Sequence, residues 1–106
     1  TGFGYRADVR AQQGRIVAVL LPRVRDIRRA GAAAVDLCWV AQGLLDGYYE
    51  RGTHLWDRAA GTAIAQAAGA RVGGLDGGPA TDSMTIAAGA RLFDPLREQL
   101  TELGAT

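Results

Sequence analysis

Three long segments of the chain repeat apolar residues at helical spacing. In Val9–Leu21, apolar positions alternate with glutamines and arginines in the pattern of an amphipathic helix, although Gly14 weakens helix formation there. Ala32–Leu45 is apolar on most sides, which predicts a helix buried between layers. Leu92–Leu103 places its leucines on a single face, so we expect a terminal helix with Pro95 in its first turn.

Short segments between these helices are predicted strands. They are Thr1–Tyr5, where the end of a strand runs into a loop, then Val24–Arg28, Tyr48–Glu50, Arg71–Gly74 and Thr85–Ala88. Helices and strands that alternate along a chain are typical of layered folds. The sequence therefore predicts an α/β fold, a layered domain with helices on both faces of a mixed sheet.

The composition fits one small domain and argues against several function classes. The chain has 106 residues, 48% of them hydrophobic, which suits a single folded domain. Its formal net charge of +1 gives no electrostatic reason to expect nucleic acid or an anionic membrane as a partner. No apolar run approaches the roughly 20 residues that span a bilayer. The single cysteine, Cys38, is expected as a buried, inert thiol, and a cytoplasmic protein is the simplest expectation.

Asp57 begins the most informative segment of the chain. The residues after it are mostly alanine and glycine, which favours a helix that approaches a neighbouring backbone closely and ends at Gly69. Aspartate is a strong N-cap residue, so one interpretation is a capped structural helix. The other is a carboxylate directed into a site, where it offers an oxygen ligand to a hard cation. The residue types alone leave both interpretations open.

The neighbours of Asp57 and the other polar candidates have structural interpretations. Trp56 is expected to be a packing residue that fixes the loop before Asp57, and His54 is expected to have no direct role. The remaining polar candidates are expected in pairs with carboxylates, in interfaces or in turns: Arg28, Arg29, Asp76 and Asp82.

The segment Trp56–Ala70 reads WDRAAGTAIAQAAGA. It resembles the C-terminal signature of the inositol monophosphatase family, in which Trp-Asp-x-Ala is followed by small residues, an apolar residue and an Ala-Gly step into a strand. Other segments resemble the family's pattern in the family's order, over nearly the whole chain: Arg28–Cys38, Leu45–Glu50, Gly77–Pro79 and Thr85–Gly89. Any one of these segments is a weak signal, and together they are a strong one.

The resemblance implies a fold, a cofactor and a set of site residues. The fold is the C-terminal half of an αβαβα phosphatase, and the cofactor is Mg²⁺, with Asp57 as one ligand. Glu50 looks like the family's glutamate that accepts a hydrogen bond from a substrate hydroxyl; the alternative is a solvated carboxylate at a strand end. Gly31, Ala32 and Ala33 look like a platform of backbone N–H groups for substrate hydroxyls; the alternative is a close-packed helix start. The family commonly has threonine or serine where Ala32 stands, so only a backbone contact is expected there.

The same resemblance shows what this chain lacks. The family has an upstream Asp-Pro-Ile/Leu-Asp-Gly-Thr segment and a paired-glutamate segment, which supply most of the metal ligands and the group that activates water. Leu75–Gly78 is only superficially similar to the first of them. We therefore expect that residues 1–106 are the C-terminal domain of a longer phosphatase, that the N-terminal domain is absent, and that this chain alone is inactive. The partners implied are a phosphorylated polyol substrate, the N-terminal half of the same enzyme and a second copy in a homodimer.

The activity implied is hydrolysis of inositol 1-phosphate by water activated on the metal. One alternative is a related phosphatase for histidinol phosphate, 3′-phosphoadenosine 5′-phosphate or fructose bisphosphate. Glu50 favours a polyol substrate over histidinol phosphate. Another alternative, from a different class, is a non-catalytic interaction domain that keeps the fold without the metal site. The upstream sequence decides between an enzyme and an interaction domain.

Overall fold

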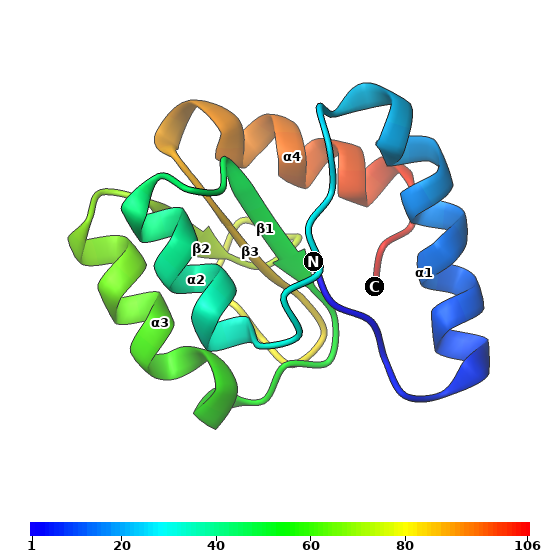
Figure 1. Cartoon of the computed structure of the whole chain (residues 1–106), viewed down its shortest axis with the longest axis horizontal. Helices are drawn as coiled ribbons and strands as arrows, with labels where there is room; N and C mark the ends of the chain where they lie inside the picture. Colours follow the sequence, from blue (N-terminus) through cyan, green and yellow to red (C-terminus); the bar gives the residue numbers. More distant parts are fainter.

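The computed structural model describes residues 1–106 as layers of helices around a small sheet (Figure 1). In chain order the elements are α1 (Ala7–Leu20), the short 3-10 helix η1 (Leu21–Arg23), α2 (Ala33–Gln42), β1 (Gly47–Glu50), α3 (Leu55–Ala67), β2 (Arg71–Gly73), β3 (Thr85–Ala88) and α4 (Ala90–Glu102). None of the helices combines the length and the apolar character needed to cross a membrane.

The sheet has three strands in the order β1-β3-β2, and both strand pairs are antiparallel. Gly47 and Arg71 lie on either side of Ala88, so the last strand of the chain is the central one. All four residues of β3 are buried. The prediction of a mixed sheet was therefore wrong in this detail, because every pair of neighbouring strands in this chain is antiparallel.

Helices cover both faces of the sheet, as the sequence pattern predicted. Successive residues of β3 point to opposite faces. Ile86 and Ala88 pack with residues of α1 and α4, whereas Ala87 packs with residues of α2 and with Tyr48 of β1. Two separate hydrophobic clusters result, one on each face, and the layered α/β fold is confirmed.

α2 and α3 lie side by side on one face of the sheet (Figure 1). Gly61 is buried where the two helices meet, and a methyl group at this position would lie 2.7 Å from the Cβ of Leu37. The small residues of α3 therefore allow a close approach of two helices. α2 is covered by α3 and by the sheet, but its Val35 is 39% exposed. Within this chain α2 is therefore not buried between two layers, contrary to the prediction.

Two predicted strands are absent from the structure. Thr1–Tyr5 and Val24–Arg28 form no strand, and their backbones meet through one hydrogen bond, from the Thr1 amino group to the carbonyl of Arg28, at 3.0 Å. A strand is stabilised by a ladder of hydrogen bonds to a neighbour. Within this chain neither segment has such a neighbour, so neither forms a strand.

The helix boundaries differ from the sequence pattern at two ends. α2 ends at Gln42 because Gly43 adopts a left-handed conformation, with φ +77°, that stops the helix before Leu45. α4 begins at Ala90, which places Pro95 inside the helix and not in its first turn.

Cys38 on α2 was expected to be buried, but in the structure it is only half-buried.

Candidate active site

A cavity of about 710 Å³ opens between the N-terminal segment, the start of α2, the end of β1 and the start of α3. Its lining includes every site residue predicted from the sequence: Gly31, Ala32, Ala33, Glu50 and Asp57. These residues come from three elements that are far apart along the chain, and the fold brings them together. The roles assigned to them stay predictions, because the cavity shows their proximity and not their chemistry.

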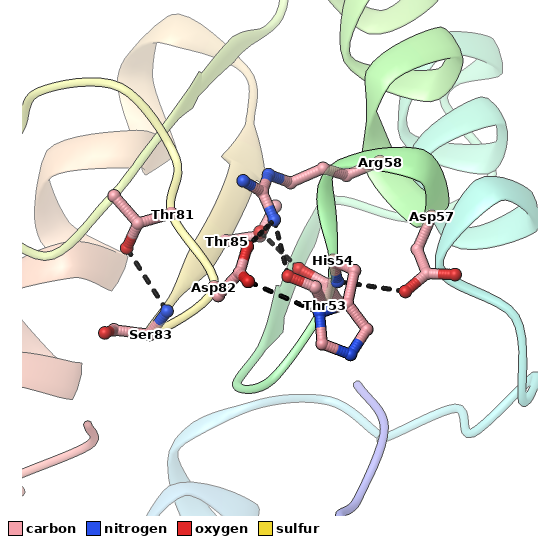
Figure 2. Close-up of polar contacts among 8 residues, drawn as sticks. All are labelled: Thr53, His54, Asp57, Arg58, Thr81, Asp82, Ser83 and Thr85. Carbon is pink, nitrogen blue, oxygen red and sulfur yellow. Dashed lines mark hydrogen bonds and ion pairs between the residues drawn. The ribbon is translucent and has the colours of Figure 1, made fainter.

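Asp57 is the third residue of α3 and not its N-cap, which corrects the sequence prediction. The N-cap is His54, and its backbone N–H donates to Oδ2 of Asp57 at 2.9 Å. An acidic residue at this position commonly accepts a hydrogen bond from the N-cap backbone. The contact fixes the exposed carboxylate of Asp57 against the helix start (Figure 2).

The surroundings of Asp57 fit one ligand position of a metal ion. Only Oδ2 is engaged by the chain, so Oδ1 is available to a cation. The first turn of a helix also favours anions, such as a phosphate, beside it. The chain nevertheless has no cluster of three or more His, Cys, Asp or Glu residues that could hold a metal ion. A role of Asp57 in metal binding therefore stays a prediction, and it would need ligands in addition to such residues of this chain.

Glu50 is the last residue of β1 and is half-buried. Its Oε1 accepts a hydrogen bond at 3.1 Å from the hydroxyl of Tyr48, which lies two residues earlier and so on the same face of the strand. Burial raises the pKa of Glu50, and the hydrogen bond from Tyr48 partly offsets this rise. Burial also raises the pKa of Tyr48, so its hydroxyl remains protonated and donates.

Gly31, Ala32 and Ala33 form the start of α2. Ala32 is the N-cap in an extended conformation and has no side chain that can accept from the first turn. The first N–H groups of a helix have no partner within the helix. Because these side chains are small, a ligand in the cavity can reach the backbone here, which is compatible with the predicted platform.

Several lining residues were not predicted from the sequence. Gly2 lies directly against Glu50, since a methyl group on it would be 2.1 Å from Oε1. Arg6, Arg29 and Arg51 also line the cavity. No local pattern marks these residues, because they reach the cavity only through the path of the N-terminal segment and the loop after β1.

Trp56 contacts the loop before Asp57, as predicted. It is 80% exposed and stacks on the ring of His54, with ring centroids 4.6 Å apart, so it packs on this loop and not in the core. His54 also approaches Asp82. Asp82 lies in a turn as expected, and it accepts a hydrogen bond at 2.7 Å from Arg58, a contact that sequence reasoning missed. Arg28 pairs with the carboxylate of Asp26 at 2.6 Å, as its residue type suggested.

Comparisons with known proteins agree with this arrangement. A model of the inositol monophosphatase family matches residues 1–104. An inositol-1-monophosphatase of Mycobacterium bovis is 57% identical over 72 residues, which is 68% of this chain and 25% of that protein. The Nus factor SuhB of Pasteurella multocida is 39% identical over 103 residues, which is 94% of this chain and 39% of that protein.

A solved structure shows the same fold. The structure of Mycobacterium tuberculosis SuhB matches with a TM-score of 0.85 and 44% identity, over 98% of this chain and 40% of that one. The chain thus spans less than half the length of these relatives. The match over residues 1–104, the identities and the shared fold together show that this chain belongs to the inositol monophosphatase family.

Proposed function

We propose that this chain is the C-terminal part of a Mg²⁺-dependent phosphate monoesterase that hydrolyses inositol 1-phosphate. The observation that carries this proposal is the single cavity lined by Asp57, Glu50 and the start of α2. Recognition of a phosphorylated polyol uses three kinds of group. Asp57 offers a carboxylate to a cation, Glu50 accepts hydrogen bonds from hydroxyl groups, and the start of α2 offers backbone N–H donors.

In this proposal Asp57 supplies one carboxylate ligand to the metal. Mg²⁺, when bound, would polarise the phosphate and activate a water molecule. The part played by this chain is to hold Oδ1 of Asp57 in one direction through the hydrogen bond from His54 to Oδ2. The start of α3 adds a favourable potential for the phosphate.

Glu50 and the start of α2 recognise the alcohol part of the substrate. The Tyr48 hydroxyl donates to Oε1 of Glu50 and so orients this carboxylate. The remaining acceptor capacity of Glu50 is available to a substrate hydroxyl. The backbone N–H groups of Ala32 and Ala33 are the second contact, with no side-chain role at Ala32.

The other metal ligands come, in this proposal, from an N-terminal domain that precedes these residues in a longer protein. Mg²⁺ needs several oxygen ligands, and this chain supplies one. We therefore expect residues 1–106 alone to release no phosphate from inositol 1-phosphate in the presence of Mg²⁺. A second copy of the longer protein would complete a homodimer.

The decisive experiment measures phosphate release by the longer protein with Mg²⁺. Inositol 1-phosphate is compared with histidinol phosphate, 3′-phosphoadenosine 5′-phosphate and fructose bisphosphate. The proposal expects the highest kcat/KM for inositol 1-phosphate. A higher value for another ester would change the substrate class, and turnover by residues 1–106 alone would contradict the division of the site between two domains.

A second candidate is a non-catalytic role in an assembly. It is favoured by the relative of Pasteurella multocida that carries the name Nus factor SuhB. Failure of the longer protein to hydrolyse any of the four esters would favour this candidate over the phosphatase.

A further inference from the structure

Asp82 lies in the turn between β2 and β3, outside the lining of the cavity, and its side chain contacts Arg58 of α3 and His54 of the loop before α3 (Figure 2). Its Oδ1 accepts from Nη1 of Arg58 at 2.7 Å. Its Oδ2 lies 3.3 Å from Nδ1 of His54, and its backbone carbonyl accepts from the N–H of Gly52 at 2.8 Å. The hydrogen bond from Arg58, followed by that from His54, lowers the pKa of Asp82, so its carboxylate is charged at neutral pH.

Arg58 is a buried cation, with its residue 8% exposed. It follows Asp57 directly in the first turn of α3, and its guanidinium reaches back to Asp82 and to the backbone carbonyl of Thr53. A charged group is costly to bury unless it is paired and hydrogen-bonded. Without the carboxylate of Asp82, Arg58 would keep its contact to a carbonyl but lose its charged partner.

The loop from Gly52 to His54 is thus held at each of its residues, to the turn or to the first residue of β3. Gly52 is held through its backbone and His54 through its ring, while the hydroxyl of Thr53 is 2.8 Å from that of Thr85, both groups being buried. The same loop then delivers the His54 N–H to Asp57. Figure 2 shows this line of contacts from Asp82 through His54 to Asp57.

We propose that Asp82 is a positioning residue for Asp57: through Arg58 and His54 it fixes the loop Gly52–His54 and the first turn of α3, and so the direction in which Asp57 presents its carboxylate to a cation. This proposal rests on the proposed function, in which Asp57 is a metal ligand. Groups that orient a ligand in this way affect metal affinity although they do not touch the metal.

The test uses Asp82→Asn in the longer protein, with Asp76→Asn as the matched control. Asp76 lies in the same β2–β3 connection and accepts only the N–H of Gly78, at 2.9 Å. Mg²⁺ affinity is measured by calorimetric titration. We expect Asp82→Asn to weaken Mg²⁺ binding about tenfold, the range found for groups that orient metal ligands, and Asp76→Asn to leave it unchanged.

Hydrogen exchange gives a second readout without metal. The amides of Gly52–Asp57 should exchange faster in Asp82→Asn than in the parent protein, and those of β3 should not. If Asp82→Asn fails to fold, the double variant Arg58→Met/Asp82→Asn, which also removes the unpaired cation, is measured in the same way. Unchanged Mg²⁺ affinity together with unchanged loop exchange would overturn the proposal.

Asp57→Asn separates this proposal from the proposed function. If Asp57→Asn lowers Mg²⁺ affinity and Asp82→Asn does not, the positioning role is wrong and the metal role of Asp57 stands. If Asp57→Asn leaves Mg²⁺ affinity unchanged, the metal role of Asp57 is itself wrong, and the positioning role is overturned with it.

Discussion

Glu50 is held between the hydroxyl of a buried tyrosine and the backbone of Gly2. Such a carboxylate has a fixed direction, and its burial has already removed part of its hydration. A hydroxyl that donates to it therefore gains a charge-assisted hydrogen bond at a low cost in side-chain entropy. Discrimination between alcohols is thus expected to depend on this residue.

Glu50→Gln keeps the shape of the side chain and removes its charge. A charge-assisted hydrogen bond contributes about 1.5–3 kcal/mol and a neutral one about 1 kcal/mol. We expect kcat/KM of the longer protein for inositol 1-phosphate to fall roughly tenfold. An aryl phosphate, which has no hydroxyl within reach, serves as the control substrate and should lose much less. Equal losses on both substrates would assign Glu50 to the metal site or to the fold.

Asp57→Asn tests the metal role while it preserves the helix start. The side-chain carbonyl of asparagine can accept the same hydrogen bond from the His54 N–H that Oδ2 accepts now. The melting temperature without Mg²⁺ should therefore stay near that of the parent protein. Activity at ordinary Mg²⁺ concentrations should fall by about two orders of magnitude or more, because a ligand is lost and not merely reoriented. Retention of most activity would leave Asp57 with a structural role only.

The contact between α2 and α3 has no room for a side chain at Gly61. The nearest atoms to a methyl group there are the Cβ and Cδ1 of Leu37, at 2.7 Å and 2.8 Å, and a Cβ cannot move without its helix. We expect Gly61→Ala to lower the free energy of unfolding by about 1–2 kcal/mol, since overpacking outweighs the gain in helix propensity.

Gly14 is the matched control for this prediction. It lies within α1 with no atom within 4 Å of an added methyl group. Gly14→Ala should raise the free energy of unfolding by about 0.5–1 kcal/mol. Urea unfolding of the two variants beside the parent protein measures both effects, and a gain in stability at Gly61 as large as that at Gly14 would contradict the close approach of the helices.

Asp36 gives α2 a pH-dependent stability. It is 0% exposed and neither of its carboxylate oxygens has a hydrogen-bond partner. Burial raises its pKa in the folded state above 3.8, and the positive charge of Arg29 partly opposes this rise. The pKa of Asp36 is thus higher in the folded state than in the unfolded state. Its contribution to the free energy of unfolding is therefore fully present below pH 3.8 and is lost as the pH rises through the folded pKa.

Asp36→Asn removes this charge and keeps the shape. We expect the variant to be more stable than the parent protein by about 1 kcal/mol at neutral pH. The difference should shrink as the pH falls toward the unfolded pKa. Urea unfolding at several pH values measures it, and a variant that is less stable at neutral pH would show that Asp36 is ionised and paired.

The success of sequence reasoning differed between elements for physical reasons. Helices α1, α2 and α4 follow from periodicity, because an amphipathic helix satisfies its own backbone hydrogen bonds. Val24–Arg28 was predicted as a strand but has no strand beside it, and a strand depends on its neighbour. Pro95 was predicted in the first turn of a helix because proline favours that position. In the structure α4 begins earlier, directly after β3 and the N-cap Gly89, so Pro95 lies inside the helix.

The candidate site was predictable only in part. Asp57 and Glu50 lie in runs with recognisable spacing, and the fold places both on one cavity. Arg58 stands at the variable position of the Trp-Asp-x-Ala motif, so the motif does not mark it. Its partner Asp82 lies far along the chain, in the turn between β2 and β3. Pairs of this kind depend on the packing of distant segments, so no local pattern could have found them.

At the scale of the whole molecule, the chain leaves many large apolar side chains in contact with water. The most exposed are Tyr5, Leu21, Leu44, Leu55, Trp56 and Ile64. Only 24 of 106 residues are buried, and exposed apolar side chains promote association. We expect residues 1–106 alone to oligomerise or aggregate unless the N-terminal domain is supplied.

Analytical ultracentrifugation measures this prediction. The sedimentation coefficient of the purified chain should rise with protein concentration, and addition of the N-terminal domain should restore one discrete species. A monomer that unfolds cooperatively at all concentrations would show that the chain is a self-sufficient domain, and it would favour the interaction role over the divided enzyme.

β3 follows β1 and β2 in the chain and is the strand that pairs with both of them. Until β3 has emerged from a ribosome, β1 and β2 therefore lack this shared partner, and α2 has no complete sheet to cover. The loop Gly52–His54, which precedes α3 and Asp57, depends on the same stretch, because Asp82 and Thr85 are residues that hold it. The arrangement of the candidate site and the closure of the sheet thus depend on the same late segment, and we expect a nascent chain that stalls before residue 82 to leave both incomplete.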